Sequence, residues 1–188
     1  MDRQNIRLNI PNVISFGRLL SVPFAVWLIL NYFHVAAFWI FVAACISDAA
    51  DGYIAKRFNL QTELGGFLDP IADKALLICV FITLGNASLI ATWLVILVVF
   101  RDALIVCGGL LYHLLYQNLS VQTLLISKIN TAFQFILAAI VLGVAAFNVV
   151  DQIVIHTLEY IVGATTIASG TSYVIMWGRK AIDMESGG

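Results

Sequence analysis

Four aspartates lie close together in an otherwise strongly apolar chain. Asp48 and Asp51 are three residues apart, and Asp69 and Asp73 are four apart. On two α-helices, each spacing places a pair of carboxylates on one helical face. Two such faces turned toward each other form an all-oxygen site, which favours Mg²⁺, Mn²⁺ or Ca²⁺ over Zn²⁺. Four carboxylates can hold two ions about 4 Å apart, an arrangement that clamps a diphosphate or a phosphoryl group under attack.

Other uses of the four aspartates have to be weighed against a metal site. Asp69 precedes Pro70, a common pair at a helix start, and is therefore a candidate helix cap. Asp48 and Asp51 are also candidates for a proton relay or for the lining of a cation path. Ionised carboxylates in hydrocarbon need compensating cations or protons, because burial and mutual repulsion both disfavour their charges. This requirement favours a metal–phosphate site, although a divalent-cation transporter stays open as an alternative.

The elements that position these aspartates are predicted to be membrane helices. The chain has 188 residues, of which 61% are hydrophobic and only 11% charged, whereas soluble domains have about a quarter charged residues. Its net charge of −1 offers no basic field for nucleic acid. We therefore predict one all-α integral membrane domain over residues 1–188, with six transmembrane helices of about 20 residues each. The expected spans are 13–33, 36–57, 64–84, 88–113, 122–147 and 153–178, preceded by a short interfacial segment over 1–12 that ends where Pro11 turns the chain.

The basic residues orient this predicted bundle. They gather in alternate connections and at both ends of the chain: Arg3, Arg7, Lys56, Arg57, Lys128, Arg179 and Lys180. Because Lys and Arg collect on cytoplasmic segments, both termini are expected in the cytoplasm. The second span then carries Asp48 and Asp51 near its cytoplasmic end, and the third carries Asp69 and Asp73 near its cytoplasmic start. The two carboxylate pairs are thus expected at a similar depth.

Small and basic residues accompany the aspartates. Gly52 follows Asp51, and Gly65 lies at the start of the third span, so a ligand can approach both backbones closely. Lys56 and Arg57 follow one turn later and either anchor the helix end or bind phosphate.

The whole pattern resembles the signature of the CDP-alcohol phosphatidyltransferases. Asp48-x2-Asp51-Gly52-x2-Ala55-Lys56-x8-Gly65-x3-Asp69-x3-Asp73 keeps every spacing of that signature over 26 residues. Lys56 departs from it, because the family usually has arginine there, which binds phosphate in a bidentate manner. Pro11-Asn12-x2-Ser15-x2-Arg18, with Pro23, is similar to the family's N-terminal segment. The resemblance implies six membrane helices and a homodimer.

The resemblance also implies roles for individual residues. Asp48, Asp51 and Asp69 are expected as metal ligands, and Asp73 as a further ligand that acts as the general base; the cofactor is expected to be Mg²⁺ or Mn²⁺, as two ions. The expected CDP-lipid site consists of Asn12, Ser15, Arg18, Gly52, Lys56, Thr62 and Gly65. The implied reaction is an in-line displacement in which an acceptor hydroxyl attacks CDP-diacylglycerol and CMP leaves.

The acceptor is expected to contact the fourth and fifth spans. An internal ion pair is one interpretation of the adjacent Arg101 and Asp102. Adjacent residues point in different directions on a helix, however, so we expect them to pair poorly. Arg101 and Lys128 are therefore interpreted as phosphate-binding residues, with Thr131 beside them. Arg-Asp together with Ser127-Lys128-Ile129-Asn130-Thr131 resembles the CMP-forming cardiolipin synthases, which use phosphatidylglycerol; phosphatidylglycerophosphate synthases, which use glycerol 3-phosphate, are the alternative. The expected location is a bacterial inner membrane, with the site near its cytoplasmic face. A non-catalytic lipid-binding relative would not need all four aspartates.

Overall fold

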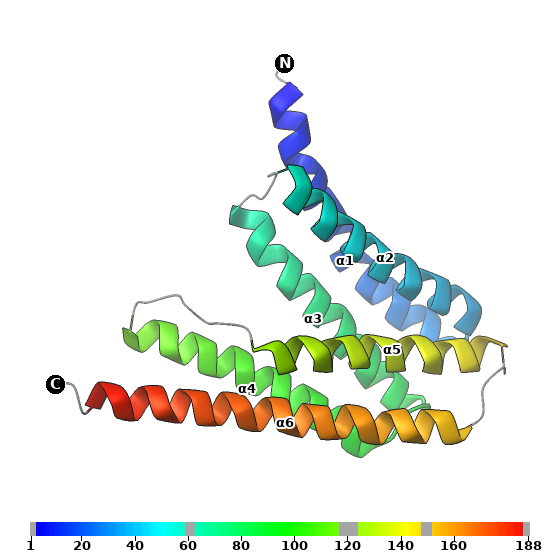
Figure 1. Ribbon diagram of the computed structural model, residues 1–188. Coiled ribbons are helices and arrows are strands. Elements are labelled where there is room, and N and C mark those ends of the chain that lie inside the picture. Colours follow the sequence, from blue (N-terminus) through cyan, green and yellow to red (C-terminus); the bar gives the residue numbers. More distant parts are fainter. Residues whose placement is uncertain (1–2, 59–62, 117–123, 148–151, 186–188) are drawn as a thin grey trace. The chain divides into compact units, whose positions relative to one another are not determined.

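The described part of the chain consists of helices joined by short turns, so its fold class is all-α as the sequence predicts. The computed structural model describes residues 3–58, 63–116, 124–147 and 152–185, and side chains within 17–48, 72–108, 124–147 and 152–179. Over these residues it forms six helices and no strand (Figure 1). The helices are α1 (Arg3–Leu30), α2 (His34–Phe58), α3 (Glu63–Asn86), α4 (Thr92–Tyr116), α5 (Leu125–Phe147) and α6 (Gln152–Glu185).

The boundary expected at Pro11 is wrong. α1 is continuous from Arg3 to Leu30, so the segment before Pro11 and the first expected span form one helix. Proline removes one hydrogen bond from a helix interior, but its fixed φ is compatible with helical geometry. The uninterrupted helical residues on both sides therefore carry the helix through Pro11. Whether residues 1–12 lie along a membrane interface stays a prediction.

The chain divides into two compact units, which are considered separately. Unit 1 comprises residues 1–90 and 138–150, and within it α1 packs against both α2 and α3. Its core consists of aliphatic and aromatic side chains at helical spacing, which is how an amphipathic helix buries one face. The buried members include Ala25 and Ile29 of α1, Ala37 and Phe41 of α2, and Leu76, Val80, Phe81 and Leu84 of α3.

Unit 2 comprises residues 91–137 and 151–188, with α4 and α6 packed side by side (Figure 1). Leu94, Val98, Val162 and Tyr173 are buried in it. This unit also buries an unusual set of polar side chains, which the next subsections use: Arg101, Asp102, Asn130, Gln134, Glu159, Thr166 and Ser169.

α1 and α3 each end in a tight turn at a residue other than glycine. Tyr32 has a φ of 61° and Ser88 a φ of 57°. In both turns the next amide reaches back five residues: Phe33 N–H donates to the Leu28 carbonyl at 2.9 Å, and Leu89 N–H to the Leu84 carbonyl at 2.9 Å. These bonds satisfy carbonyls that a helix end leaves free. The turns thus end α1 before α2 and α3 before α4.

Two helices of the described residues are long and apolar enough to cross a membrane. They are Leu125–Phe147 and Gln152–Arg179, and shorter apolar stretches cover Gly17–Leu30 and His34–Asp48. The predicted count of six spans and the cytoplasmic placement of both termini stay predictions.

Candidate functional site

Asp48 and Asp73 converge on one arginine of α1. Arg18 Nη1 lies 2.7 Å from Asp48 Oδ1 and 2.6 Å from Asp73 Oδ1. The guanidinium is buried, whereas the side chains of Asp48 and Asp73 keep 40% and 27% of their surface exposed. The site therefore joins α1, α2 and α3 through a single nitrogen atom. Because a cation already bridges the two carboxylates, this position stabilises positive charge.

Small side chains on α1 and α2 leave a cavity next to this ion pair. The cavity has a volume of about 310 Å³ and is lined by Gly17, Arg18, Ser21, Ile40, Ala43, Ala44 and Ser47. Ser21 Oγ donates to the Arg18 carbonyl at 2.6 Å, so this hydroxyl is directed back to its own helix. The cavity is mostly apolar, with the Arg18 side chain as its charged member. Such a surface suits a ligand that joins an apolar part to an anionic one.

The donor set around Arg18 fits a hard divalent ion. Carboxylate oxygens are the ligands that Mg²⁺ and Mn²⁺ prefer. Among the side chains that the structure describes, no group of three His, Cys, Asp or Glu residues is gathered as metal ligands. The backbones of Asp51 and Asp69 belong to α2 and α3, but their side chains lie outside the described set. The two carboxylates with described side chains, Asp48 of α2 and Asp73 of α3, are suitable ligands for such an ion and come from the two expected helices.

The capping interpretation of Asp69 is wrong. α3 begins at Glu63, so Asp69 and Pro70 lie inside the helix and not at its start. Arg18 is the member of the expected CDP-lipid site whose side chain the structure describes. Thr62 lies outside the described residues altogether, and the side chains of Asn12, Ser15, Gly52, Lys56 and Gly65 do so as well.

A second arginine, Arg101, is buried in unit 2 and fully engaged with its neighbours. Its Nη1 lies 2.5 Å from Asp102 Oδ1, and Arg101 and Asp102 are 3% and 2% exposed. The expectation that these adjacent residues would pair poorly is wrong, because the long arginine stem lets the guanidinium fold back to the neighbouring carboxylate. Arg101 Nη2 also donates to Ser127 of α5 at 2.5 Å and to Ser169 of α6 at 2.6 Å. Arg101 thus ties three helices together.

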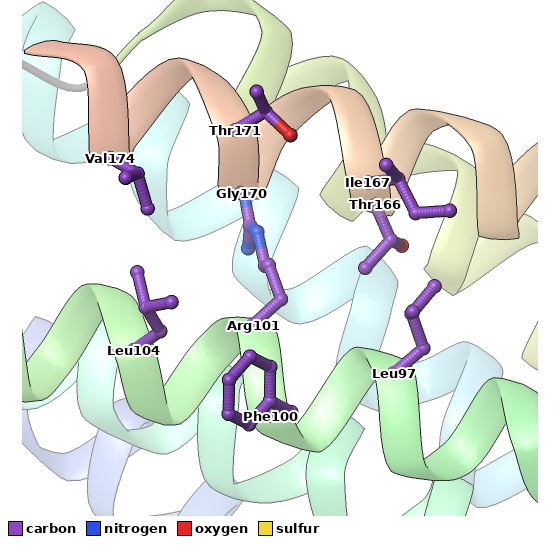
Figure 2. Close-up of a pocket in the computed structure, with 9 residues that line it drawn as sticks. All are labelled: Leu97, Phe100, Arg101, Leu104, Thr166, Ile167, Gly170, Thr171 and Val174. Carbon is purple, nitrogen blue, oxygen red and sulfur yellow. The ribbon is translucent and has the colours of Figure 1, made fainter.

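Arg101 also borders a cavity of about 310 Å³ between α4 and α6. Figure 2 shows its side chain extending from α4 toward Gly170 of α6. A Cβ atom at Gly170 would lie 3.7 Å from Arg101 Cγ, which is ordinary contact distance. The other lining residues are mainly apolar, so the cavity presents the stem of the arginine and not a free charge.

The other two expected acceptor residues begin α5. Lys128 is exposed, and Thr131 is half-buried with its hydroxyl donating to the Ser127 carbonyl at 3.0 Å. Ser127 therefore links Arg101 to the helical turn that carries Lys128 and Thr131. Sequence reasoning missed Ser127 and Ser169 as partners of Arg101. The sequence did offer a signal for these partners, because a buried guanidinium group requires hydrogen-bond acceptors. Ser127 and Ser169 are polar residues in otherwise apolar helices, and such residues are candidates for that role.

The comparisons with known proteins decide the family. A family model described as CDP-alcohol phosphatidyltransferase matches residues 8–173. The chain belongs to the CDP-alcohol phosphatidyltransferase family. The match includes the convergent residues Arg18, Asp48 and Asp73 as well as Arg101.

Individual relatives carry two different enzyme names. A chloroplastic CDP-diacylglycerol–glycerol-3-phosphate 3-phosphatidyltransferase of Oryza sativa subsp. japonica is 36% identical over 189 residues, which covers 90% of this chain and 57% of the relative. A CMP-forming cardiolipin synthase of Rattus norvegicus is 33% identical, covering 95% of this chain and 64% of the relative. A CDP-diacylglycerol–glycerol-3-phosphate 3-phosphatidyltransferase of Rickettsia bellii is 34% identical, covering 88% and 93%. This chain thus spans about three fifths of the rice and rat relatives.

Proposed function

We propose that the chain transfers a phosphatidyl group from CDP-diacylglycerol to a hydroxyl group of a glycerol-containing acceptor and releases CMP. The observation that carries the proposal is the convergence of Asp48 and Asp73 on Arg18, in a chain that belongs to this family. Two half-exposed carboxylates and a buried cation, next to a mostly apolar cavity, suit a ligand with an anionic diphosphate and apolar chains.

We place the metal at the four aspartates. Asp48, Asp51, Asp69 and Asp73 are proposed to hold two Mg²⁺ or Mn²⁺ ions, which when bound neutralise the diphosphate and make CMP a better leaving group. Asp73 is proposed to accept the proton of the attacking hydroxyl. Its half-exposed side chain keeps access to an incoming hydroxyl while Arg18 fixes its position. Asn12, Ser15, Arg18, Gly52, Lys56, Thr62 and Gly65 are proposed to line the CDP-lipid site.

Phosphatidylglycerol is the proposed acceptor, which makes the activity that of a CMP-forming cardiolipin synthase. Lys128 and Thr131 are proposed to contact the acceptor phosphate. Arg101, whose charge Asp102 already compensates, supports the same turn through its hydrogen bond to Ser127. A phosphodiester needs fewer free cations than a phosphomonoester, and Lys128 is the exposed cation of this group. Glycerol 3-phosphate is the second candidate acceptor, because the rice and Rickettsia relatives are named for it.

The site is proposed to lie near the cytoplasmic face of a bacterial inner membrane, in a homodimer. Support for the membrane comes from the exposed large apolar side chains of several helices, among them Leu20, Trp27, Phe100, Ile153 and Ile167. Large apolar side chains exposed on both units suit contact with lipid.

One reconstitution experiment tests the proposed function. Purified protein is supplied with CDP-diacylglycerol and Mg²⁺ or Mn²⁺, and separately with phosphatidylglycerol, glycerol 3-phosphate or inositol phosphate, while CMP release is measured. We expect CMP release that requires the metal and is fastest with phosphatidylglycerol. Release with glycerol 3-phosphate alone would reassign the acceptor. No CMP release with any of the three would refute the transferase and favour transport or lipid binding.

A further inference from the structure

Two amide side chains on α5 are completely buried one turn apart. Asn130 and Gln134 are both 0% exposed. Asn130 Oδ1 accepts hydrogen bonds from two hydroxyls of α6, Thr165 at 2.8 Å and Thr166 at 3.0 Å. In this arrangement the NH₂ group of Asn130 lies on the other side of the amide, away from the two hydroxyls.

The remaining polar atoms of this pair have no hydrogen-bond partner among the described residues. Asn130 Nδ2 and both amide atoms of Gln134 are buried without a hydrogen bond to any atom of the chain that the structure describes. Nearly all buried polar groups in folded proteins are hydrogen-bonded, because an orphaned group forfeits its bonds to water. Three such atoms on one face of one helix are therefore suited to bind a polar group of a ligand.

The donors and acceptors select the class of ligand group. Gln134 offers an NH₂ group that donates and a carbonyl oxygen that accepts, and a hydroxyl group is the common ligand group that both donates and accepts. Asn130 Nδ2 adds donors, which a hydroxyl oxygen accepts as well. A phosphoryl oxygen fits less well, because the Gln134 carbonyl oxygen would face its negative charge, and Lys128 nearby in sequence is the better phosphate partner.

We propose that Asn130 and Gln134 bind the secondary hydroxyl of the acceptor's glycerol, the hydroxyl that does not react. This inference rests on the proposed function, because it takes the glycerol acceptor from there. The secondary hydroxyl is present both in the headgroup of phosphatidylglycerol and in glycerol 3-phosphate. Asn130 and Gln134 share one face of α5, in the same first turns of the helix that carry Lys128 and Thr131.

The test removes the hydroxyl from the ligand and the amide from the protein. Each acceptor is compared with its analogue that lacks the secondary hydroxyl: 3-hydroxypropyl phosphate for the soluble acceptor, and phosphatidyl-1,3-propanediol in nanodiscs for the lipid. One of these two pairs contains the acceptor that the protein uses. For that pair we expect the wild type to prefer the hydroxylated acceptor roughly 10- to 100-fold in kcat/KM, because the analogue cannot form the hydrogen bonds of the missing hydroxyl. In Gln134→Met, whose side chain has a similar shape, the preference is expected to fall to about twofold or less.

Stability and binding measurements separate this role from a structural one. If Gln134 is only a structural misfit, Gln134→Met raises thermal stability and leaves the hydroxyl preference unchanged, which would overturn the inference. Asn130→Asp keeps the oxygen that Thr165 and Thr166 need but removes the NH₂ donors, so it is also expected to reduce the preference. Thr83→Val is the matched control, because Thr83 is also a buried polar residue but donates to the Cys79 carbonyl of its own helix at 2.6 Å. It should leave the preference at the wild-type value.

The inference can fail independently of the proposed function. Binding of the same four acceptors is measured by thermal shift without CDP-diacylglycerol. Hydroxyl-selective binding that depends on Gln134, in a protein that releases no CMP, would support the inference and refute the transferase. Normal CMP release with the same hydroxyl preference in wild type and Gln134→Met would refute the inference and leave the transferase intact.

Discussion

Arg18 and Arg101, the two buried arginines among the described side chains, solve the same electrostatic problem in different ways. Arg18 bridges carboxylates from two other helices, and both carboxylates stay half-exposed. Arg101 pairs with the adjacent, fully buried Asp102 and is further bonded to serines of α5 and α6. The first arrangement leaves carboxylate oxygens accessible to a further ligand. The second encloses both charges within the protein.

This difference separates a site for chemistry from a structural one. Half-exposed carboxylates around a cation can exchange that cation for a metal or a substrate group at modest cost. A buried ion pair cannot be opened in the same way, because breaking it leaves an uncompensated charge away from water. We therefore expect substitutions at Asp48, Asp73 and Arg18 to affect metal and turnover, and substitutions at Arg101 and Asp102 to affect folding first.

The largest expected effect is on turnover in Asp73→Asn. The amide cannot accept the proton of the acceptor hydroxyl, so CMP release should fall about 10²- to 10⁴-fold, the usual contribution of a general base. Mn²⁺ binding, followed by electron paramagnetic resonance, should be weakened but retained. Asp102→Asn is the matched control in the other cluster: any loss of activity there should follow the loss of folded protein. Normal turnover in Asp73→Asn would remove this residue from the mechanism.

The next largest effect is on stability in Arg101→Met. Asp102 would lose the Arg101 guanidinium while staying buried, and breaking a buried ion pair in this way costs about 3–5 kcal/mol. The double variant Arg101→Met/Asp102→Leu should recover most of this loss, because an apolar pair of similar volume can replace a buried ion pair. Arg18→Met provides the comparison, with an expected loss smaller by several kcal/mol since its carboxylate partners can be hydrated. Thermal unfolding in detergent measures all three. Equal losses for the two single variants would refute the distinction between the clusters.

The sequence predicts the first cluster well because helical periodicity is a local property. Spacings of three and four residues determine which face carries Asp48 and Asp73, and the charge pattern predicts that α2 and α3 bring them together. Arg18 as their bridge could not be predicted, because it lies 55 residues before Asp73 and nothing local selects a partner so far along the chain. Its expected role in CDP-lipid binding stays a prediction.

The second cluster shows why partner choice is harder to predict than position. The direction of the helix backbone at Arg101 and Asp102 suggested poor pairing, but a flexible stem and the lack of water decide the outcome, and the two residues pair. Similarly, Pro11 indicated a helix boundary, yet α1 continues through it. Periodicity therefore gives the helices and their faces, while burial decides which side chains pair.

A smaller effect is expected for Ser169→Ala. This change removes the acceptor for Arg101 Nε at 3.2 Å and for Nη2 at 2.6 Å, while Asp102 and Ser127 keep their bonds. Hydrogen bonds to charged groups contribute about 1.5–3 kcal/mol, so thermal unfolding should show a loss in this range. Ser172→Ala is the control on the same helix, because Ser172 is only partly buried and donates to the Ala168 carbonyl of its own helix. A loss no larger than that of the control would mean that Arg101 depends on Asp102 and Ser127 alone.

The smallest expected effect, and the most direct test of exchange at the first cluster, is on metal affinity in Arg18→Met. The guanidinium occupies the space between Asp48 and Asp73 and competes electrostatically with a divalent ion for the same oxygens. Its removal should therefore tighten Mn²⁺ binding in the absence of substrate, by roughly 3- to 10-fold, equivalent to about 1 kcal/mol for a half-exposed pair. Calorimetric titration measures the affinity, and Arg179→Met, at the far end of α6, controls for the loss of one positive charge. Weaker Mn²⁺ binding in Arg18→Met than in this control would show that Arg18 organises the carboxylates for the metal instead of competing with it.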